Sequence, residues 1–167
     1  MKAKFIKATA PDISRVNQIY KASFSEKGQV QDFGNLIYSN DVSVTIAVLP
    51  EDGVSGLGFV IMRTIRNESE IIMVCVLPEY RRQGLATLLM IDVIDKAVEL
   101  GVTSVFLEVS EDNREAKSMY KKLGFKNVGK RKKYYKNNNT RSDAIVKKLS
   151  LDEKETKLIY SKLKKQY

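Results

Sequence analysis

The stretch from Glu70 to Val109 constrains the fold most, because two apolar, strand-like runs are joined there by one long helical pattern. The first run, EIIMVCVL, leads through the turn PEYRRQG into a segment whose apolar residues recur at helical spacing. This pattern predicts a helix from Arg82 to Leu100, stopped by Gly101. The second run, SVFLEV, follows. A strand, a crossover helix and a second strand are typical of parallel neighbours, so we expect these two strands to pair in parallel.

The residues before this stretch predict short, mixed elements. KFIKA is a strand-like run, and Thr9, Pro11 and Asp12 form a capping-box pattern with proline near the helix start. The helix that they open is expected to reach about Phe24, and a weaker helix is expected over Val30–Tyr38. VSVTIAVL, GFVIMRTI and EIIMVCVL predict three successive strands, two of them joined as a hairpin through PEDGVSG.

The residues after it supply one helix and two strands. Asn113 is the predicted N-cap of a helix that runs to Leu123 and ends at Gly124. KNVGKR and DAIVKKL predict two strands, with the polar KNNNT as an exposed loop between them. The expected fold class is therefore α/β (α+β), in one domain covering residues 1–149.

Residues 150–167 predict a C-terminal helical extension. Ser150 and the acidic Asp152 and Glu153 form a capping-box pattern at its start. Its apolar stripe is too narrow to stabilise a lone helix in water, and consists of Leu151, Leu158, Ile159 and Leu163. We expect this helix to dock on the domain or on a neighbouring subunit, with a frayed tail as the alternative. A homo-oligomer is compatible with this pattern.

Composition removes several classes of function. The chain has no histidine, which argues against Ser-His and Cys-His hydrolases and histidine-based zinc sites, and no metal is expected. The single cysteine, Cys75, lies in an apolar run and is predicted to be a small buried hydrophobe. No apolar stretch approaches the roughly 18 residues of a membrane span, so we expect a cytoplasmic protein without a membrane partner. The net charge of +9 indicates an anionic partner: nucleic acid, a membrane surface or a phosphorylated cofactor.

The turn before the long helix has the character of an anion site. A helix N-terminus presents unpaired N–H groups and a partial positive charge, Gly84 permits close approach of a ligand, and Arg81 and Arg82 offer charged donors. An ordinary solvated helix start is the alternative interpretation. The rival GFKNVGKR is not a P-loop, because Arg131 stands where a magnesium-binding Ser or Thr is required, and no G-x-G-x-x-G follows a predicted strand.

These residues resemble a known family. RRQGLA is similar to the acyl-CoA signature of the GCN5-related N-acetyltransferases (GNAT). From about Ile71 to Lys148, three motifs in order resemble the bacterial ribosomal-protein-alanine N-acetyltransferases: IIMVCVLPEYRRQGLATLL, FLEVSEDNREAKSMYKKLGF and RKKYYKNNNTRSDAIV. The resemblance implies a mixed, mostly antiparallel sheet in which two parallel strands splay apart, with acetyl-CoA in the gap. It implies cofactor contacts from Val74, Cys75, Val76, Arg82, Gln83, Gly84, Leu85, Ala86, Thr87 and Asn113.

Two residues are candidates for acid–base chemistry. Glu108 interrupts the apolar strand FLEV, where another hydrophobe is expected, although an ordinary ion pair with a basic residue is the alternative. Tyr120 lies two helical turns after Asn113 on the same face, although a tyrosine at helical spacing is usually core. The resemblance implies that Glu108 is the proton acceptor and that Tyr120 donates a proton to the departing CoA thiolate.

The sequence constrains the identity of the amine that accepts the acetyl group less than it constrains the type of reaction. Tyr134 and Tyr135 lie in KRKKYYKNNN, a basic segment with aromatics that also suits nucleic-acid stacking. The resemblance favours a peptide groove over nucleic acid at these tyrosines. Three hypotheses remain in falling order: an N-terminal protein acetyltransferase acting on a substrate such as a ribosomal protein, an acetyltransferase for a small amine or lysine, and a non-catalytic acyl-CoA or nucleic-acid binding module.

Overall fold

The computed structural model describes residues 3–24, 33–137, 140–152 and 154–166. One seven-stranded sheet has the order β1-β2-β3-β4-β5-β7-β6. Its strands are β1 (Lys4–Lys7), β2 (Val42–Val48), β3 (Gly56–Ile65), β4 (Glu68–Val76), β5 (Ser104–Ser110), β6 (Lys126–Asn137) and β7 (Thr140–Ser150). The helices are α1 (Ile13–Ser23), α2 (Phe33–Tyr38), α3 (Leu85–Glu99), α4 (Arg114–Lys122) and α5 (Lys154–Gln166), with short 3₁₀ turns at Ala10–Asp12 and Pro78–Tyr80.

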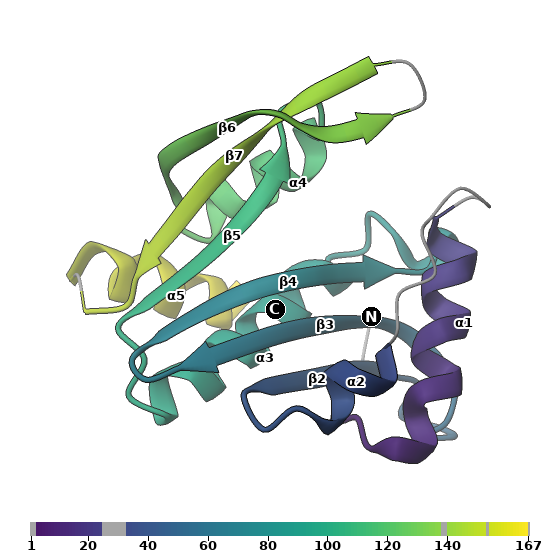
Figure 1. The fold of residues 1–167 in the computed structure, drawn as a ribbon. Coiled ribbons are helices and arrows are strands. Elements are labelled where there is room, and N and C mark those ends of the chain that lie inside the picture. Colours follow the sequence, from purple (N-terminus) through teal and green to yellow (C-terminus); the bar gives the residue numbers. More distant parts are fainter. Residues whose placement is uncertain (1–2, 25–32, 138–139, 153, 167) are drawn as a thin grey trace.

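The parallel pair predicted from the crossover helix is present. β4 and β5 pair in parallel, and the other neighbouring strands pair antiparallel. The sheet therefore consists of two antiparallel wings, β1–β4 and β5-β7-β6, joined at one parallel seam (Figure 1). The successive strands β2, β3 and β4 form the predicted hairpin and a second, tighter one at Arg66, whose φ is 56°.

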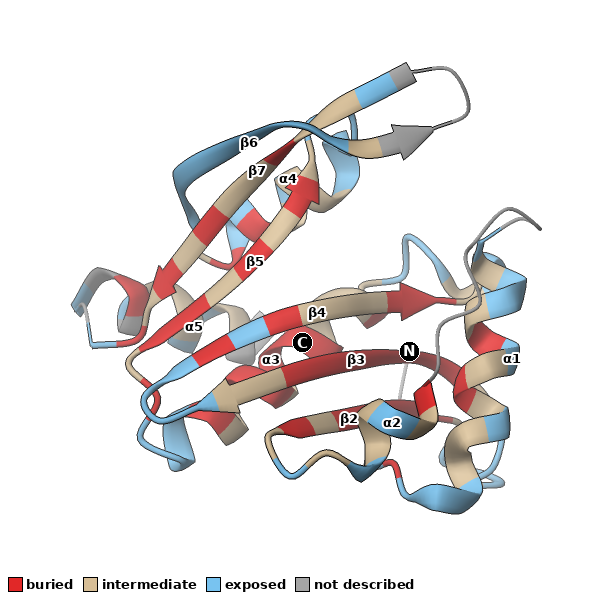
Figure 2. Ribbon diagram, in the orientation of Figure 1, coloured by how far each residue is buried: buried red, intermediate tan, exposed pale blue. Residues whose placement is uncertain are grey.

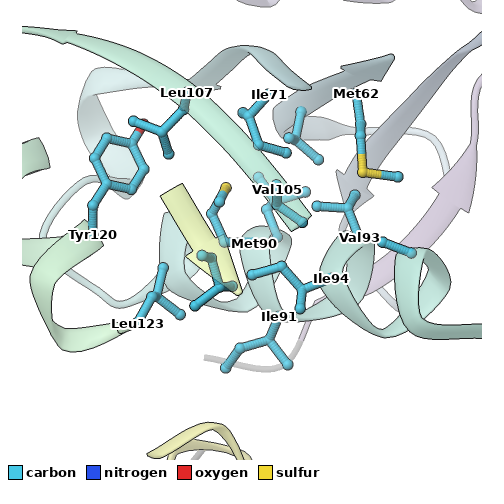
Figure 3. Packing of buried hydrophobic residues seen from close by; sticks show 14 of the residues in the cluster. Met62, Ile71, Met90, Ile91, Val93, Ile94, Val105, Leu107, Tyr120 and Leu123 are labelled. Atoms are coloured by element: carbon cyan, nitrogen blue, oxygen red, sulfur yellow. The ribbon is translucent and has the colours of Figure 1, made fainter. Parts of the chain in front are cut away.

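Helices cover the two faces of the sheet unequally. Val16, Ile19 and Phe33 from α1 and α2 pack on one face of the first wing. On the opposite face, α3 packs with its buried apolar side across the seam between the wings (Figures 1 and 3). Burial of each large aliphatic side chain stabilises the fold by about 1.5–3 kcal/mol, so the α3 face is a principal link between the wings. Figure 2 shows the buried residues concentrated in the central strands.

The capping interactions predicted at two helix starts are present in the structure. The Thr9 amide and hydroxyl both bond the Asp12 carboxylate, at 2.9 and 3.0 Å, which is the predicted capping interaction ahead of α1. The Asn113 carboxamide oxygen accepts a hydrogen bond of 3.0 Å from the Ala116 amide and caps α4. The weaker predicted helix is present as α2 from Phe33, while residues 30–32 lie outside the described residues.

Three predicted boundaries are wrong or only partly tested. The long helix begins at Leu85 and not at Arg82, because Arg82 and Gly84 have φ values of 63° and 83°, which no helix accommodates. KNNNT is not wholly a loop, because β6 reaches Asn137, where it pairs with Thr140 of β7. Ser150 ends β7, and residue 153 of the predicted cap lies outside the described residues.

The C-terminal helix α5 lies against the rest of the molecule. Tyr160 donates a hydrogen bond to the Ile91 carbonyl of α3, and Tyr160 and Leu163 pack on the main core. Thr156 is buried, whereas the predicted stripe residue Leu158 is 56% exposed. The face of α5 that packs on the rest of the molecule therefore differs from the apolar stripe predicted from the sequence. None of the described helices is long and apolar enough to cross a bilayer.

Candidate active site

A cleft opens where the two parallel strands part. β4 and β5 are paired only from Glu68↔Ser104 to Ile71↔Leu107, although both strands continue. The ladder with β3 shifts between Ile61↔Met73 and Met62↔Ile71, which leaves Ile72 as an extra, bulged residue. A bulge bends its strand and increases its twist, so the bulge accounts for the divergence of β4 from β5 (Figure 1).

The cleft has a volume of about 1010 Å³ and is lined by both wings. Of the predicted cofactor residues, it brings together Val74, Cys75, Val76, Arg82, Gly84, Leu85, Ala86, Thr87 and Asn113. Gln83 is not in the lining, and its side chain bonds the Glu79 carbonyl at 3.0 Å. Both predicted catalytic residues, Glu108 and Tyr120, line the cleft. Burial raises the pKa of the Cys75 thiol, which keeps that side chain a neutral, mostly apolar part of the wall.

The turn that leads into α3 is built for close approach. Arg82 and Gly84 take the left-handed backbone conformation, and Gly84 is the N-cap of α3. Leu85, Ala86 and Thr87, the first residues of that helix, line the cleft beside them. The unpaired N–H groups and the positive end of the helix dipole therefore meet at the cleft, which is the environment that an anion prefers.

The two arginines of the turn have different partners. Arg81 donates from Nε to the Val76 carbonyl at 3.0 Å and from Nη2 to the Ser23 carbonyl at 2.9 Å. It thus ties α1 to the end of β4, and it also lines the cleft. Arg82 forms an exposed ion pair with Glu115 of α4 across the cleft mouth. That pair joins the two wings.

Tyr120 is held with its ring in the core and its hydroxyl group at the cleft. The ring packs against Phe125 with a centroid distance of 5.8 Å, and it lies in the same core cluster as Leu107 (Figure 3). Burial, with a smaller contribution from Tyr135, raises the pKa of Tyr120 to about 12. The hydroxyl therefore keeps its proton at neutral pH.

Glu108 faces the cleft from β5, with a side chain that is 16% exposed. Its Oε1 lies 3.0 Å from Nε of Arg131 on β6, so the ion pair of the alternative interpretation is present. Tyr135 also lines the cleft, and burial, followed by the charge of Glu108, raises the pKa of its phenol. Tyr134 does not line the cleft and is 52% exposed, with the Arg131 guanidinium 5.4 Å from its ring centre.

Sequence reasoning missed part of the cleft wall. Arg114, Ser118 and Lys122 line the cleft one helical turn apart on α4. Their i, i+4 spacing was the available signal. Tyr20 and Phe24 line it from the other wing, and their rings contact each other at 4.9 Å.

The residues present fit the cofactor that the resemblance implies. Acetyl-CoA needs a long cleft, an anion site for its pyrophosphate and further cations for its remaining phosphate. The cleft supplies the amides at the start of α3, and Arg82, Arg114 and Lys122 stand along its wall. The described residues contain no group of three or more Cys, Asp or Glu side chains placed to hold a metal ion.

Comparison with known proteins relates this architecture to one family. A protein-family model described as the Acetyltransferase (GNAT) family matches residues 13–125. The [ribosomal protein bS18]-alanine N-acetyltransferase of Escherichia coli K12 is 34% identical over 93 residues, which are 56% of this chain and 63% of that protein. A protein from Bacillus subtilis described as a putative enzyme of the same kind is 28% identical over 142 residues, which are 85% of this chain and 91% of that protein.

The overall fold of this chain is also similar to that of a solved structure of one of these relatives. The crystal structure of the E. coli ribosomal-protein-S18-alanine N-acetyltransferase superposes with a TM-score of 0.82 at 23% identity, covering 91% of this chain and 96% of that one. At that identity the likeness establishes the fold, including the sheet with its single parallel seam. The family model matches more than half of the residues of this chain, and the chain therefore belongs to the GNAT family of acetyltransferases.

Proposed function

We propose that this protein transfers the acetyl group of acetyl-CoA to a primary amine, and that the preferred amine is the N-terminal α-amine of a protein such as a ribosomal protein. One observation carries the proposal. The start of α3, the carboxylate of Glu108 and the protonated hydroxyl of Tyr120 all face a single cleft between the splayed strands.

The acid–base equipment of the cleft favours an α-amine. Only a neutral amine attacks a thioester. An α-amine with a pKa near 7.8 loses its proton at about pH 7.4 for less than about 1 kcal/mol, whereas a lysine side chain requires about 4 kcal/mol. An α-amine therefore requires much less of the proton acceptor than a lysine side chain does, and the carboxylate assigned to that role, Glu108, is paired with Arg131.

Each residue has a distinct role in this mechanism. The amides at the start of α3 hold the pyrophosphate, and the unpaired edge of β4 at Val74–Val76 lies along the pantetheine arm. The amine nitrogen forms a bond to the acetyl carbon, and the carbon–sulfur bond breaks. Glu108 accepts the proton that the nitrogen loses, and Tyr120 donates its proton to the departing sulfur.

Two features support a peptide as the acceptor. The E. coli relative is named for acetylation of an alanine of a ribosomal protein. In this chain, the aromatic residues Tyr20 and Phe24 on one wing and Tyr135 on the other stand on opposite walls of the cleft. We assign Tyr135 to the walls of the peptide groove, with Tyr134 at its outer rim.

The choice of acceptor is tested by CoA release from acetyl-CoA with three amines. They are a peptide with a free N-terminal alanine, a peptide with a blocked N-terminus and one lysine, and a free polyamine. The alanine peptide should have the highest kcat/KM. Faster reaction with the lysine peptide or the polyamine would instead identify the small-amine or lysine alternative, and acetyl-CoA binding without turnover on any amine would identify a non-catalytic module.

The catalytic assignment is tested with Glu108→Gln and Tyr120→Phe. Each change should lower kcat by about 100-fold or more while acetyl-CoA affinity stays near that of the wild type. Glu111→Gln is the matched control, because Glu111 is also a carboxylate paired with a β6 cation, Lys130, and lies outside the cleft. Wild-type turnover in both cleft variants would show that neither residue moves a proton.

A further inference from the structure

Arg81 joins three parts of the cleft wall that come from different elements. Its Nε donates to the Val76 carbonyl group at 3.0 Å, and its Nη2 donates to the Ser23 carbonyl group at 2.9 Å. The Ser23 hydroxyl group donates to the same Val76 carbonyl group at 3.2 Å. These three hydrogen bonds, the Arg81 clamp, connect the end of α1, the end of β4 and the turn that leads into α3 (Figure 1).

Arg81 acts as a C-terminal cap of α1. The last four carbonyl groups of a helix have no partner within the helix, and a cation at this end also interacts favourably with the helix dipole. Ser23 is the last residue of α1, and its carbonyl group accepts from the Arg81 guanidinium. The cap of this helix is therefore supplied by a distant residue of the cofactor turn.

Core packing secures the middle of α1 more firmly than its last turn. Val16 and Ile19 are 0% and 2% exposed and pack on the first wing. The remaining residues of α1, 20–23, are all described, and each of them is partly or fully exposed. Tyr20 among them packs its ring 5.2 Å from that of Phe33. Helix ends with few buried contacts open easily, so the direction of this last turn depends on the Arg81 clamp.

The turn that the clamp holds forms a wall of the cleft. Tyr20 and Phe24 line the cleft from the first wing, with their ring centres 4.9 Å apart. The proposed proton acceptor and proton donor, Glu108 and Tyr120, lie on β5 and α4 of the second wing. Both carbonyl groups that Arg81 bonds belong to the first wing. Loss of the clamp should therefore move the aromatic wall and leave the proton-transfer groups in place.

The distribution of charge favours the same side of the cleft for an amine. Residues 1–113 contain 11 Lys and Arg against 15 Asp and Glu, a net charge of −4. Residues 114–167 contain 18 Lys and Arg against 5 Asp and Glu, a net charge of +13. A protonated N-terminus is attracted to the first part, which includes α1, and repelled by the second, which includes α4, β6 and β7.

We propose that Arg81 is a positioning residue for the acceptor: by capping α1, it fixes Tyr20 and Phe24 in the wall of the acceptor site. The proposal rests on the proposed function, because it concerns acceptor binding in the same cleft. A contact with the phosphates of acetyl-CoA would instead make Arg81 control cofactor affinity. A purely structural brace would act regardless of whether the aromatic wall is present. Positioning acts on the KM of the acceptor peptide, through these two rings.

The test measures kcat and KM for a peptide with a free N-terminal alanine, together with acetyl-CoA affinity in calorimetry. Arg81→Ala should raise the peptide KM by about tenfold or more, while kcat and acetyl-CoA affinity stay within about threefold of the wild type. Arg81→Lys, which keeps a cation at the end of α1, should recover part of this loss. Ser23→Ala removes one bond of the clamp and should raise the peptide KM by about threefold.

Lys21→Ala is the matched control. It removes the same charge from the last turn of α1, at an exposed position that does not line the cleft. Its peptide KM should therefore equal that of the wild type. If Arg81→Ala does not fold, Ser23→Ala and Arg81→Lys make the same comparison with Lys21→Ala.

A double-mutant cycle distinguishes positioning from a structural brace. Tyr20→Ala combined with Phe24→Ala removes the wall through which Arg81 acts, and should itself raise the peptide KM. In that background, Arg81→Ala should raise the peptide KM by less than about twofold further, because little remains to be positioned. A structural brace would give the full effect in both backgrounds.

Three results would overturn the proposal while acetyl transfer stands. They are an unchanged peptide KM in the folded clamp variants, a loss confined to acetyl-CoA affinity, and an undiminished effect of Arg81→Ala in the background that lacks both rings. A wild-type protein that acetylates no peptide would refute the proposed function, and this proposal with it.

Discussion

Tyr120 combines a ring that stabilises the core with a hydroxyl group that faces the cleft. Its pKa of about 12, raised mainly by burial, exceeds the value of about 10 expected in the unfolded chain. The folded state therefore holds this proton more tightly. The resulting stabilisation is complete below about pH 10 and is lost as the pH rises toward about 12.

This difference predicts an alkaline loss of stability that depends on one hydroxyl group. Between about pH 8 and about pH 11, the wild type should lose about 1.4 kcal/mol more unfolding free energy than Tyr120→Phe. Urea unfolding at the two pH values measures it. Tyr38→Phe, which removes an exposed hydroxyl group, should behave as the wild type does. Equal alkaline losses in the wild type and Tyr120→Phe would mean that the Tyr120 proton is not held by burial.

Gly84 allows a second test at the residue scale. Gly84 and Gly101 both have a positive φ, 83° and 76°, so a side chain at either position carries a similar backbone strain of about 1 kcal/mol. Only Gly84 lines the cleft, and the space around Gly101 is open. Gly84→Trp should weaken acetyl-CoA binding in calorimetry by about tenfold or more, whereas Gly101→Trp should preserve it. Undiminished affinity in a folded Gly84→Trp protein would place the pyrophosphate elsewhere.

For individual residues, the sequence predicts which side chains face the cleft better than it predicts the residues with which they pair. Glu108 stands out because a carboxylate interrupts an apolar strand, and it does face the cleft. Its ion pair with Arg131 depends on the β6–β7 register, which contains two irregularities that no local pattern reveals. The same irregularities separate Tyr135, in the cleft wall, from Tyr134, outside it.

At the scale of elements, α5 connects parts of the structure that are far apart in sequence. Tyr160 bonds the Ile91 carbonyl of α3, and a Cβ at Gly124, after α4, would lie 3.9 Å from Ile159. Helix α5 therefore contacts the helix that begins at the cofactor cleft and the end of the helix that carries Tyr120.

Docking of α5 predicts slow amide exchange over Thr156–Leu163 in the native protein. Tyr160→Phe removes the hydrogen bond to Ile91, so it should accelerate exchange in α5 and lower the unfolding free energy by about 1 kcal/mol. Leu158→Ala, at an exposed position of the same helix, should change that free energy by less than about 0.5 kcal/mol. Exchange throughout α5 at the rate of an unfolded chain would show that the helix does not stay docked.

The elements that the sequence predicts well have strong local signals. The β4–α3–β5 crossover follows from two apolar runs and one amphipathic helix, and its parallel pairing follows from chain connectivity. The face of α5 is harder to predict. Thr156, Ile159, Tyr160 and Leu163 share one side at helical spacing, but a short helix with few apolar residues allows several stripes, and tertiary contacts choose among them.

At the scale of the whole molecule, the cleft itself is a tertiary property. The sequence identifies the two strands that flank it but not the point where they separate, which is set by one extra residue, Ile72, in the β4 ladder. Apolar β-branched residues occur before and after that position, so no change of composition marks the bulge. The family resemblance implied the splay, and the register explains it.

The segregation of charge along the chain also has a consequence for motion in solution. A body with −4 over residues 1–113 and +13 over residues 114–167 has a large permanent electric dipole moment. In the field of a polyanion, such a body experiences a torque as well as an attraction, so it turns its α4, β6 and β7 side forward before contact. Fewer collisions are then wasted on unproductive orientations, and added salt should slow the encounter rate before it shortens the lifetime of a complex already formed.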